Sequence, residues 1–176
     1  RDGERKIQSR MGLSASAEYV DEFLKEISTI WKKENTEYRY QGKKVDAVLV
    51  DEAQFLSEAE IDTLSDLVDF YNIPVICYGL RTDFRNRLFP GSRRLMEIAD
   101  VIEEVPTVCW CGKRAQCNTR YANGEIVREG AQIMLGSNES YVALCRKHYK
   151  EGKLWKEAGA ENETSTRRNC KIMEKE

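Results

Sequence analysis

Residues 45–79, with the sequence VDAVLVDEAQFLSEAEIDTLSDLVDFYNIPVICYG, decide the fold class. They open with VDAVLV (45–50), a short apolar run typical of an interior strand of a parallel sheet, although periodicity alone also admits a buried helix segment. The middle predicts a helix, because Ser57 and Glu60 have the spacing of a capping box and apolar residues follow along one face. IPVICYG (73–79) is a second buried-strand pattern. This order predicts an α/β fold with a parallel sheet and a right-handed crossover.

The segments on either side extend this unit. Upstream, YVDEFLKEISTIWKKEN (19–35) has apolar residues at helical spacing and predicts an amphipathic helix. Downstream, LRTDFRNRLFPGSRR (80–94) combines arginines, isolated phenylalanines and a Pro-Gly break. It predicts a binding loop, after which Ser92 caps a helix over RRLMEIAD (93–100).

The second half of the chain has a different texture. Three pieces are strand-like, and Asn123-Gly124 is a strong turn signal; the pieces are AQCNTRY (115–121), AQIMLG (131–136) and YVALC (141–145). The last residues are polar and without sustained periodicity. We therefore expect an α/β domain (1–106), a small β-rich domain (107–152) and a mobile tail (153–176).

Composition excludes some classes of function. The 176 residues include 28 Lys and Arg against 30 Asp and Glu, a net charge of -2, so no overall field draws the chain to nucleic acid. No apolar window of about 18 residues and no secretory leader is found, so we expect no membrane partner and a cytoplasmic location. In such a chain, six cysteines favour metal binding or free thiols over disulfides.

Two adjacent carboxylates, Asp51 and Glu52, follow the first strand of the unit. Ligands of open α/β sheets bind beyond the carboxyl ends of strands. There an aspartate can act on Mg²⁺ bound to ATP phosphates, and a second acid can take a proton from an attacking hydroxyl or water. Alternatively, the pair only caps the following turn, and by itself the motif does not decide.

A second group of residues has the composition of a metal site. Cys109, Cys111, Cys145 and His148 form two close pairs, and His148 is the only histidine in the chain. Three thiolates and an imidazole suit a closed structural zinc site, with no position left for water. The alternative is a chance order of buried thiols and a surface imidazole.

Together these motifs carry a resemblance to a known family. They are, in order, SRMGL (9–13), VLVDEAQFL (48–56), VICYGLRTDFRNRLFPGS (75–92), CWC (109–111) and GSNESYVALCRKHY (136–149). Over residues 1 to about 150 the chain resembles the zinc-containing type II thymidine kinases. The resemblance implies a P-loop NTPase (RecA-like) parallel sheet with flanking helices, and a small β-rich zinc-binding domain with a lasso loop.

That family transfers the γ-phosphate of ATP to the 5′-hydroxyl of thymidine, giving dTMP for DNA synthesis by nucleotide salvage. The resemblance implies Glu52 as catalytic base, Mg²⁺ and ATP at Asp51, Glu52, Ala53 and Gln54, and structural Zn²⁺ at the Cys₃His set. It also implies a homotetramer and feedback inhibition by dTTP. The implied thymidine-binding residues are Phe55, Leu80, Phe84, Phe89, Asn118, Arg120, Met134 and Tyr141; of these, Tyr141 closes the lasso over thymine and Arg120 faces the substrate's phosphate side.

One family motif is missing from the printed sequence. The phosphate-binding loop GxxxxGK[ST] does not occur, and RDGERKIQSRMGL (1–13) looks like a stretch well inside the usual family sequence. We therefore expect this chain alone to lack kinase activity. Two other classes stay open at this point: a helicase-like ATPase fragment, suggested by DEAQ (51–54), and a zinc-ribbon module that binds nucleic acid.

Overall fold

The computed structural model describes residues 5–8, 14–30, 39–133 and 140–155. The chain is a mixed α/β protein that divides into two compact units, residues 1–105 and 106–176. Several features of the sequence lie outside the described residues: the SRMGL motif at 9–13, residues 31–35 of the helix expected over 19–35, residues 134–139 with Met134 and the start of the GSNESYVALCRKHY motif, and the tail from residue 156 onward.

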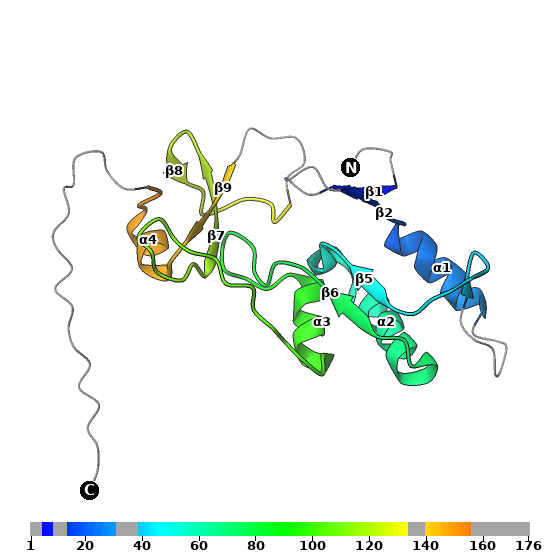
Figure 1. Ribbon diagram of the computed structural model, residues 1–176. Helices are drawn as coiled ribbons and strands as arrows, with labels where there is room; N and C mark the ends of the chain where they lie inside the picture. The colour runs from blue at the N-terminus through cyan, green and yellow to red at the C-terminus, as the bar shows by residue number, and fades with distance from the viewer. Residues whose placement is uncertain (1–4, 9–13, 31–38, 134–139, 156–176) are drawn as a thin grey trace, which may run out of the picture. The chain divides into compact units, whose positions relative to one another are not determined.

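The centre of the first unit is the expected strand-helix-strand element (Figure 1). Strand β5 (Val48–Val50) pairs in parallel with β6 (Val75–Cys77), in the register Val50 opposite Cys77. Helix α2 (Glu58–Tyr71) connects them, and the Ser57–Glu60 capping box predicted from the sequence is present. The core of this unit includes Val50, Leu64, Leu67 and Ile73. The prediction of a parallel strand-helix-strand unit is confirmed.

The segment before β5 contains one predicted helix and two hairpins that the sequence pattern did not predict. Helix α1 (Val20–Ile30) places Leu24 in the core of the unit. Antiparallel pairs form between β1 (Lys6–Gln8) and β2 (Ser14–Ser16) and between β3 (Arg39–Tyr40) and β4 (Lys43–Lys44). Strands of two or three residues are too short to show an alternating pattern, so periodicity could not reveal them.

Helix α3 corrects one prediction. It spans Pro90–Ile98, with Phe89 at the N-cap, so the expectation that Ser92 caps a helix over 93–100 is wrong. Proline is well suited to the first turn of a helix, because the N–H that it lacks has no helical partner there. Ser92 instead lies buried, and its hydroxyl donates to the Leu80 carbonyl at 2.7 Å.

The second unit is a three-stranded antiparallel sheet with a short helix. Its strands are β7 (Cys117–Ala122), β8 (Glu125–Ile126) and β9 (Ser140–Leu144), in the order β8-β7-β9, followed by α4 (Arg146–Glu151). The Asn123-Gly124 turn joins β7 to β8, with both residues at positive φ as the sequence predicted. The strand expected over 131–136 is wrong for residues 131–133, which are irregular, while residues 134–136 lie outside the described part. Among the described residues, no helix is long and apolar enough to span a membrane.

Candidate functional site

The two acids lie in a turn that is fastened to the ends of both parallel strands. The backbone N–H of Tyr78 donates to the Val50 carbonyl at 2.8 Å, and the N–H of Ala53 donates to the Tyr78 carbonyl at 2.9 Å. Asp51 and Glu52 therefore stand at the carboxyl ends of β5 and β6, with both side chains exposed. A short 3₁₀ helix, η1 (Ala53–Phe55), follows them. This is where ligands bind in open α/β sheets.

Glu52 has an unusual backbone conformation. Its φ of 54° and ψ of 34° place it in the left-handed region, where a non-glycine residue costs about 1–2 kcal/mol. Its N–H donates to Asp51 Oδ1 at 2.9 Å, and its carbonyl accepts from the Phe55 N–H at 3.1 Å. Strain of this kind at the end of a strand is typical of functional sites.

Gln54 connects this turn to the loop that follows β6. It is 1% exposed, its Oε1 accepts the Leu80 N–H at 3.0 Å, and its Nε2 donates to Glu52 Oε2. A Cβ on residue 79 would lie 2.5 Å from Gln54 Oε1, so Gly79 is what lets the side-chain amide approach. The structure thus brings three of the predicted nucleotide-site residues, Glu52, Ala53 and Gln54, into one tight turn.

The four apolar residues predicted to surround thymidine in the first unit differ in exposure. Phe55 and Leu80 are 47% and 42% exposed, whereas Phe84 and Phe89 are buried. The rings of Phe55 and Phe89 meet edge to face, with centroids 5.6 Å apart. Phe55 ends η1, five residues after the apolar strand β5, and as a phenylalanine it would by itself be expected in the core. It is exposed instead, and its ring packs on that of Phe89.

Asp83 organises the loop between β6 and α3. Its side chain is fully buried; Oδ1 accepts the backbone N–H groups of Arg85 and Arg87 at 2.8 and 2.9 Å. Oδ2 accepts both Nε and Nη2 of Arg85, at 3.1 and 2.9 Å. A carboxylate held by four N–H groups makes this a rigid loop. The arginine-rich stretch of the sequence is therefore in part an internal scaffold.

The predicted Cys₃His set comes together in the second unit. The ligand atoms of Cys109, Cys111, Cys145 and His148 all lie within 4.8 Å of one another. The Cys109 sulfur lies 3.3 Å from His148 Nδ1, and the Cys111 and Cys145 sulfurs are 4.0 Å apart. Two sulfurs bound tetrahedrally to zinc at about 2.3 Å are about 3.8 Å apart, so the spacing and the donor set both fit a metal ion.

The electrostatics of the thiols agree with a metal site. Burial raises the pKa of Cys109, but hydrogen bonds from the backbone of Cys111 and Cys145 and from His148 outweigh it and lower the pKa from 9.0 to about 6. The Lys113 N–H lowers the pKa of Cys111, yet burial and the neighbouring sulfurs raise it overall. The pKa of Cys109 falls and that of Cys111 rises because two adjacent thiolates repel each other. A cation between the sulfurs would remove this repulsion.

An aromatic ring supports the histidine of this set. Trp110 stacks on His148 with ring centroids 4.0 Å apart and an interplanar angle of 4°, and its indole N–H donates to the Lys153 carbonyl at 3.2 Å. Because Trp110 lies between two of the cysteines, the same short segment supplies two sulfurs and orients the imidazole. Ring contacts and hydrogen bonds of this kind orient the ligands of a metal.

Arg120 is the largest fully buried side chain of the described residues. It lies opposite Tyr141 across β7 and β9, and its Nε donates to the Tyr141 hydroxyl at 2.9 Å. Its two Nη atoms donate to the carbonyls of Ala131 and Gln132 at 3.0 and 3.2 Å. Tyr141 is 49% exposed, and Asn118 lies half-buried on β7. The Arg120 guanidinium was predicted to face a phosphate, but each of its three nitrogens donates to a group of the protein.

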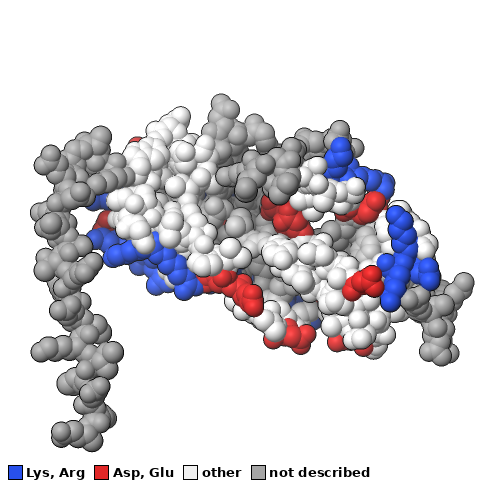
Figure 2. Space-filling model, in the orientation of Figure 1, with Lys and Arg blue, Asp and Glu red and all other residues white. Residues whose placement is uncertain are grey.

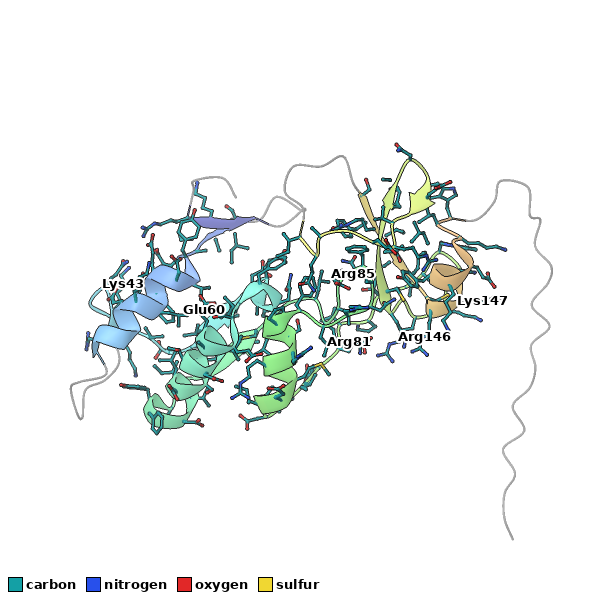
Figure 3. The ribbon with its side chains drawn as sticks, turned by 180° about the vertical axis from the view of Figure 1, so that it is seen from behind. Lys43, Glu60, Arg81, Arg85, Arg146 and Lys147 are labelled. Atoms are coloured by element: carbon teal, nitrogen blue, oxygen red, sulfur yellow. The ribbon has the colours of Figure 1, made fainter. Side chains whose placement is uncertain are left out.

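Basic side chains gather on the second unit beside α4 (Figure 2). Figure 3 shows Arg146 and Lys147 on this helix. Lys147 is paired with Glu151 at 3.7 Å, and Arg146 donates to Gln116 Oε1 at 3.3 Å. A zinc-ribbon module would need such basic residues to bind nucleic acid. Here Glu151, on the same helix, partly offsets their charge through its pair with Lys147.

Fold and site together define a mixed α/β protein with an acidic turn at the ends of parallel strands and a Cys₃His cluster that could hold a metal ion. The family model described as thymidine kinase matches residues 1–149. The thymidine kinase of Haemophilus influenzae is 48% identical over 152 residues, which cover 86% of this chain and 76% of that relative. The thymidine kinase of Pasteurella multocida is 45% identical over 152 residues, with the same coverage, and that of Colwellia psychrerythraea is 42% identical over 147 residues, covering 83% and 73%. The chain belongs to the thymidine kinase family.

Reasoning from sequence missed three structural roles at these sites. The carboxylate of Asp83, the hydrogen bonds of Gln54 and the stacking of Trp110 each depend on which groups the fold brings within contact. A signal existed only for Trp110, since an aromatic residue between two cysteines stands within reach of any shared ligand cluster.

Proposed function

We propose that this protein is a thymidine kinase that transfers the γ-phosphoryl group of ATP to the 5′-hydroxyl of thymidine, in the salvage of nucleotides for DNA synthesis. The observation that carries the proposal is the exposed carboxylate of Glu52 at the strand ends, held by a buried amide, in a member of this family. The helicase-like and zinc-ribbon alternatives are not favoured by the family to which the chain belongs.

In the proposed step, Glu52 accepts the proton of the thymidine 5′-hydroxyl. The oxygen then bonds to the γ-phosphorus while the bond from that phosphorus to the β–γ bridging oxygen breaks, and ADP leaves with the bonding pair. Phosphoryl transfer depends mainly on positioning and on charge stabilisation. A base in a turn fastened to two strand ends suits that requirement.

Asp51 is the proposed residue for Mg²⁺. Carboxylate oxygens are ligands that this ion prefers, and Asp51 is exposed beside the base. When bound, Mg²⁺ neutralises charge that develops on the phosphates. By resemblance, Ala53 and Gln54 belong to the ATP site in this proposal, as buried residues beneath its surface.

Thymidine is proposed to bind between aromatic and apolar residues of the family motifs. The accessible Phe55 and Leu80 supply contact surface, and Phe89, buried, packs against Phe55; Phe84 is buried as well. In the second unit, Asn118, Met134 and Tyr141 are proposed to contact the base, with Arg120 toward the phosphate side; Met134 lies outside the described residues. The proposed order of domains remains 1–106 for nucleotide binding, 107–152 for the lasso and 153–176 for the tail.

Zn²⁺ is the metal we propose for Cys109, Cys111, Cys145 and His148. Four protein ligands leave no open position, so the ion stabilises the unit and takes no part in chemistry. The fold of the first unit is proposed to be RecA-like, and the family's homotetramer, dTTP inhibition and cytoplasmic location are proposed by resemblance.

The test is thymidine-dependent formation of ADP by the full-length protein, with the Glu52→Gln variant beside it. We expect the variant to bind thymidine as the wild type does and to turn over about 100-fold or more slowly. Glu103→Gln is the matched control, since Glu103 is an exposed glutamate outside the helices and strands and outside the family motifs, and its turnover should be unchanged. Normal turnover by Glu52→Gln contradicts the assignment of the base.

A further inference from the structure

We propose that Gln54 is a positioning residue for Glu52: its buried side-chain amide holds the Glu52 carboxylate in place to receive the proton of the substrate hydroxyl. The inference rests on the proposed function and deepens it. In this inference Gln54 does not contact ATP; it acts on the reaction through Glu52.

The direction of the Gln54 amide follows from its two partners. The group at one end is the backbone N–H of Leu80, a donor, so it must face the amide oxygen. The nitrogen is then turned toward Glu52, whose ionised carboxylate can only accept. Only this orientation satisfies both contacts, and it presents an N–H to the base in its charged form.

Burial limits Gln54 to an indirect role. With 1% of its surface exposed, it has no area for contact with a nucleotide. Gly79 lies directly against it, because a Cβ on Gly79 would lie 2.5 Å from the Gln54 oxygen. A polar side chain enclosed so closely acts on what it bonds to, and one of its two bonds goes to Glu52.

Glu52 needs such a partner. Its side chain is exposed and has three rotatable bonds, so nothing in the backbone alone determines where the carboxylate points. The left-handed backbone at Glu52 turns the chain so that Gln54, two residues on, reaches its carboxylate. A bond from a fixed, buried group reduces the positions that the carboxylate samples, and misplacement of a reacting group by about 1 Å can cost about 100-fold in rate.

The experiment compares kcat and KM of the full-length protein with those of Gln54→Met, Gln54→Glu and Ser92→Ala. Gln54→Met removes both hydrogen bonds at similar volume. Ser92→Ala is the matched control, because it removes a different hydrogen bond to the same loop residue, Leu80, without touching Glu52. Gln54→Glu keeps an oxygen for the Leu80 N–H, but offers Glu52 a proton only while its new carboxyl is protonated.

We expect Gln54→Met to lower kcat about 10- to 100-fold with the KM for thymidine within about threefold, and Ser92→Ala to leave both near wild type. For Gln54→Glu, kcat relative to wild type should fall as the pH is raised from about 6 to about 9, because ionisation removes the donor and adds repulsion. If Gln54→Met folds poorly, the pH dependence of the Gln54→Glu to wild-type kcat ratio tests the inference instead.

A wild-type kcat in Gln54→Met overturns the inference, as does a pH-independent ratio in Gln54→Glu. Equal losses of kcat in Gln54→Met and Ser92→Ala overturn it too, because they indicate loosening of the loop alone. If the wild type itself forms no ADP with thymidine, the proposed function fails and the inference with it, so the two failures are distinguishable.

Discussion

Gly91→Ala should destabilise the first unit, although alanine favours helices over glycine. A Cβ at this position of α3 would lie 2.5 Å from the Ala53 carbonyl oxygen, 2.7 Å from that of Leu56 and 3.1 Å from that of Gln54. All three are backbone atoms of η1 or of its C-cap, so α3 and η1 must move apart. Overpacking costs about 1–3 kcal/mol, and two contacts below 3.0 Å place this site near 3. The helix gains at most about 1 kcal/mol, leaving a net loss of about 2 kcal/mol.

Thermal unfolding of the full-length protein, followed by circular dichroism at 222 nm, measures this loss. At about 2–4 °C per kcal/mol for a chain of this size, the melting temperature should fall by about 4–8 °C. Met96→Ala, on the exposed side of the same helix, is the control and should change stability by less than about 0.5 kcal/mol. An unchanged or higher melting temperature for Gly91→Ala refutes the reasoning, because it means that α3 can shift from η1 without cost. We expect kcat to fall as well, since η1 directly follows Glu52.

Three further predictions concern the metal cluster and the loop. Cys145→Ser should reduce bound zinc, measured by elemental analysis, from about one ion per chain to near none, whereas Cys117→Ser, a buried cysteine outside the set, should keep it; retention in both contradicts the ligand set. Trp110→Ala should weaken zinc affinity about 10-fold in a chelator competition, and Trp110→Phe should lose less because a ring still stacks on His148; equal affinity in all three proteins excludes the stacking role. Asp83→Asn should lower the free energy of unfolding in urea by about 2–3 kcal/mol, because the new amide N–H₂ would face N–H donors of Arg85 and the charge that pairs with this arginine is lost. A loss below about 0.5 kcal/mol shows that the ion pair is dispensable.

Local patterns predicted the centre of the first unit well. The apolar runs, the helical periodicity between them and the capping box gave a parallel strand-helix-strand element, as observed in β5, α2 and β6. Such signals are local, because each depends on residues within a few positions of one another. The predicted start of α3 was wrong by about one turn. Pro90 and Ser92 are both residues that commonly stand at a helix start, and packing against η1 selects the earlier one.

The sequence predicted which residues belong to the candidate sites, but it did not predict their exposure or their contacts. The spacing of the cysteines and histidine indicated a metal site, and the cluster in the second unit agrees with it. The acids were placed at a strand end from the pattern alone. Phenylalanine is usually buried, but Phe55 is exposed. The turn after β5 places its ring at the surface, where one side of it packs on the buried Phe89.

By itself, the sequence determined the class of fold of the first unit, the four members of the Cys₃His cluster and the family resemblance, because periodicity, caps and the spacing of cysteines and histidine are properties of neighbours along the chain. Only the tertiary structure decided which polar groups serve the sites and which serve the scaffold. Gln54 meets Leu80, and Arg120 meets Tyr141, only when separate segments are brought side by side. A hydrogen bond requires its two groups within about 3 Å, and that proximity is set by the packing of segments far apart in sequence.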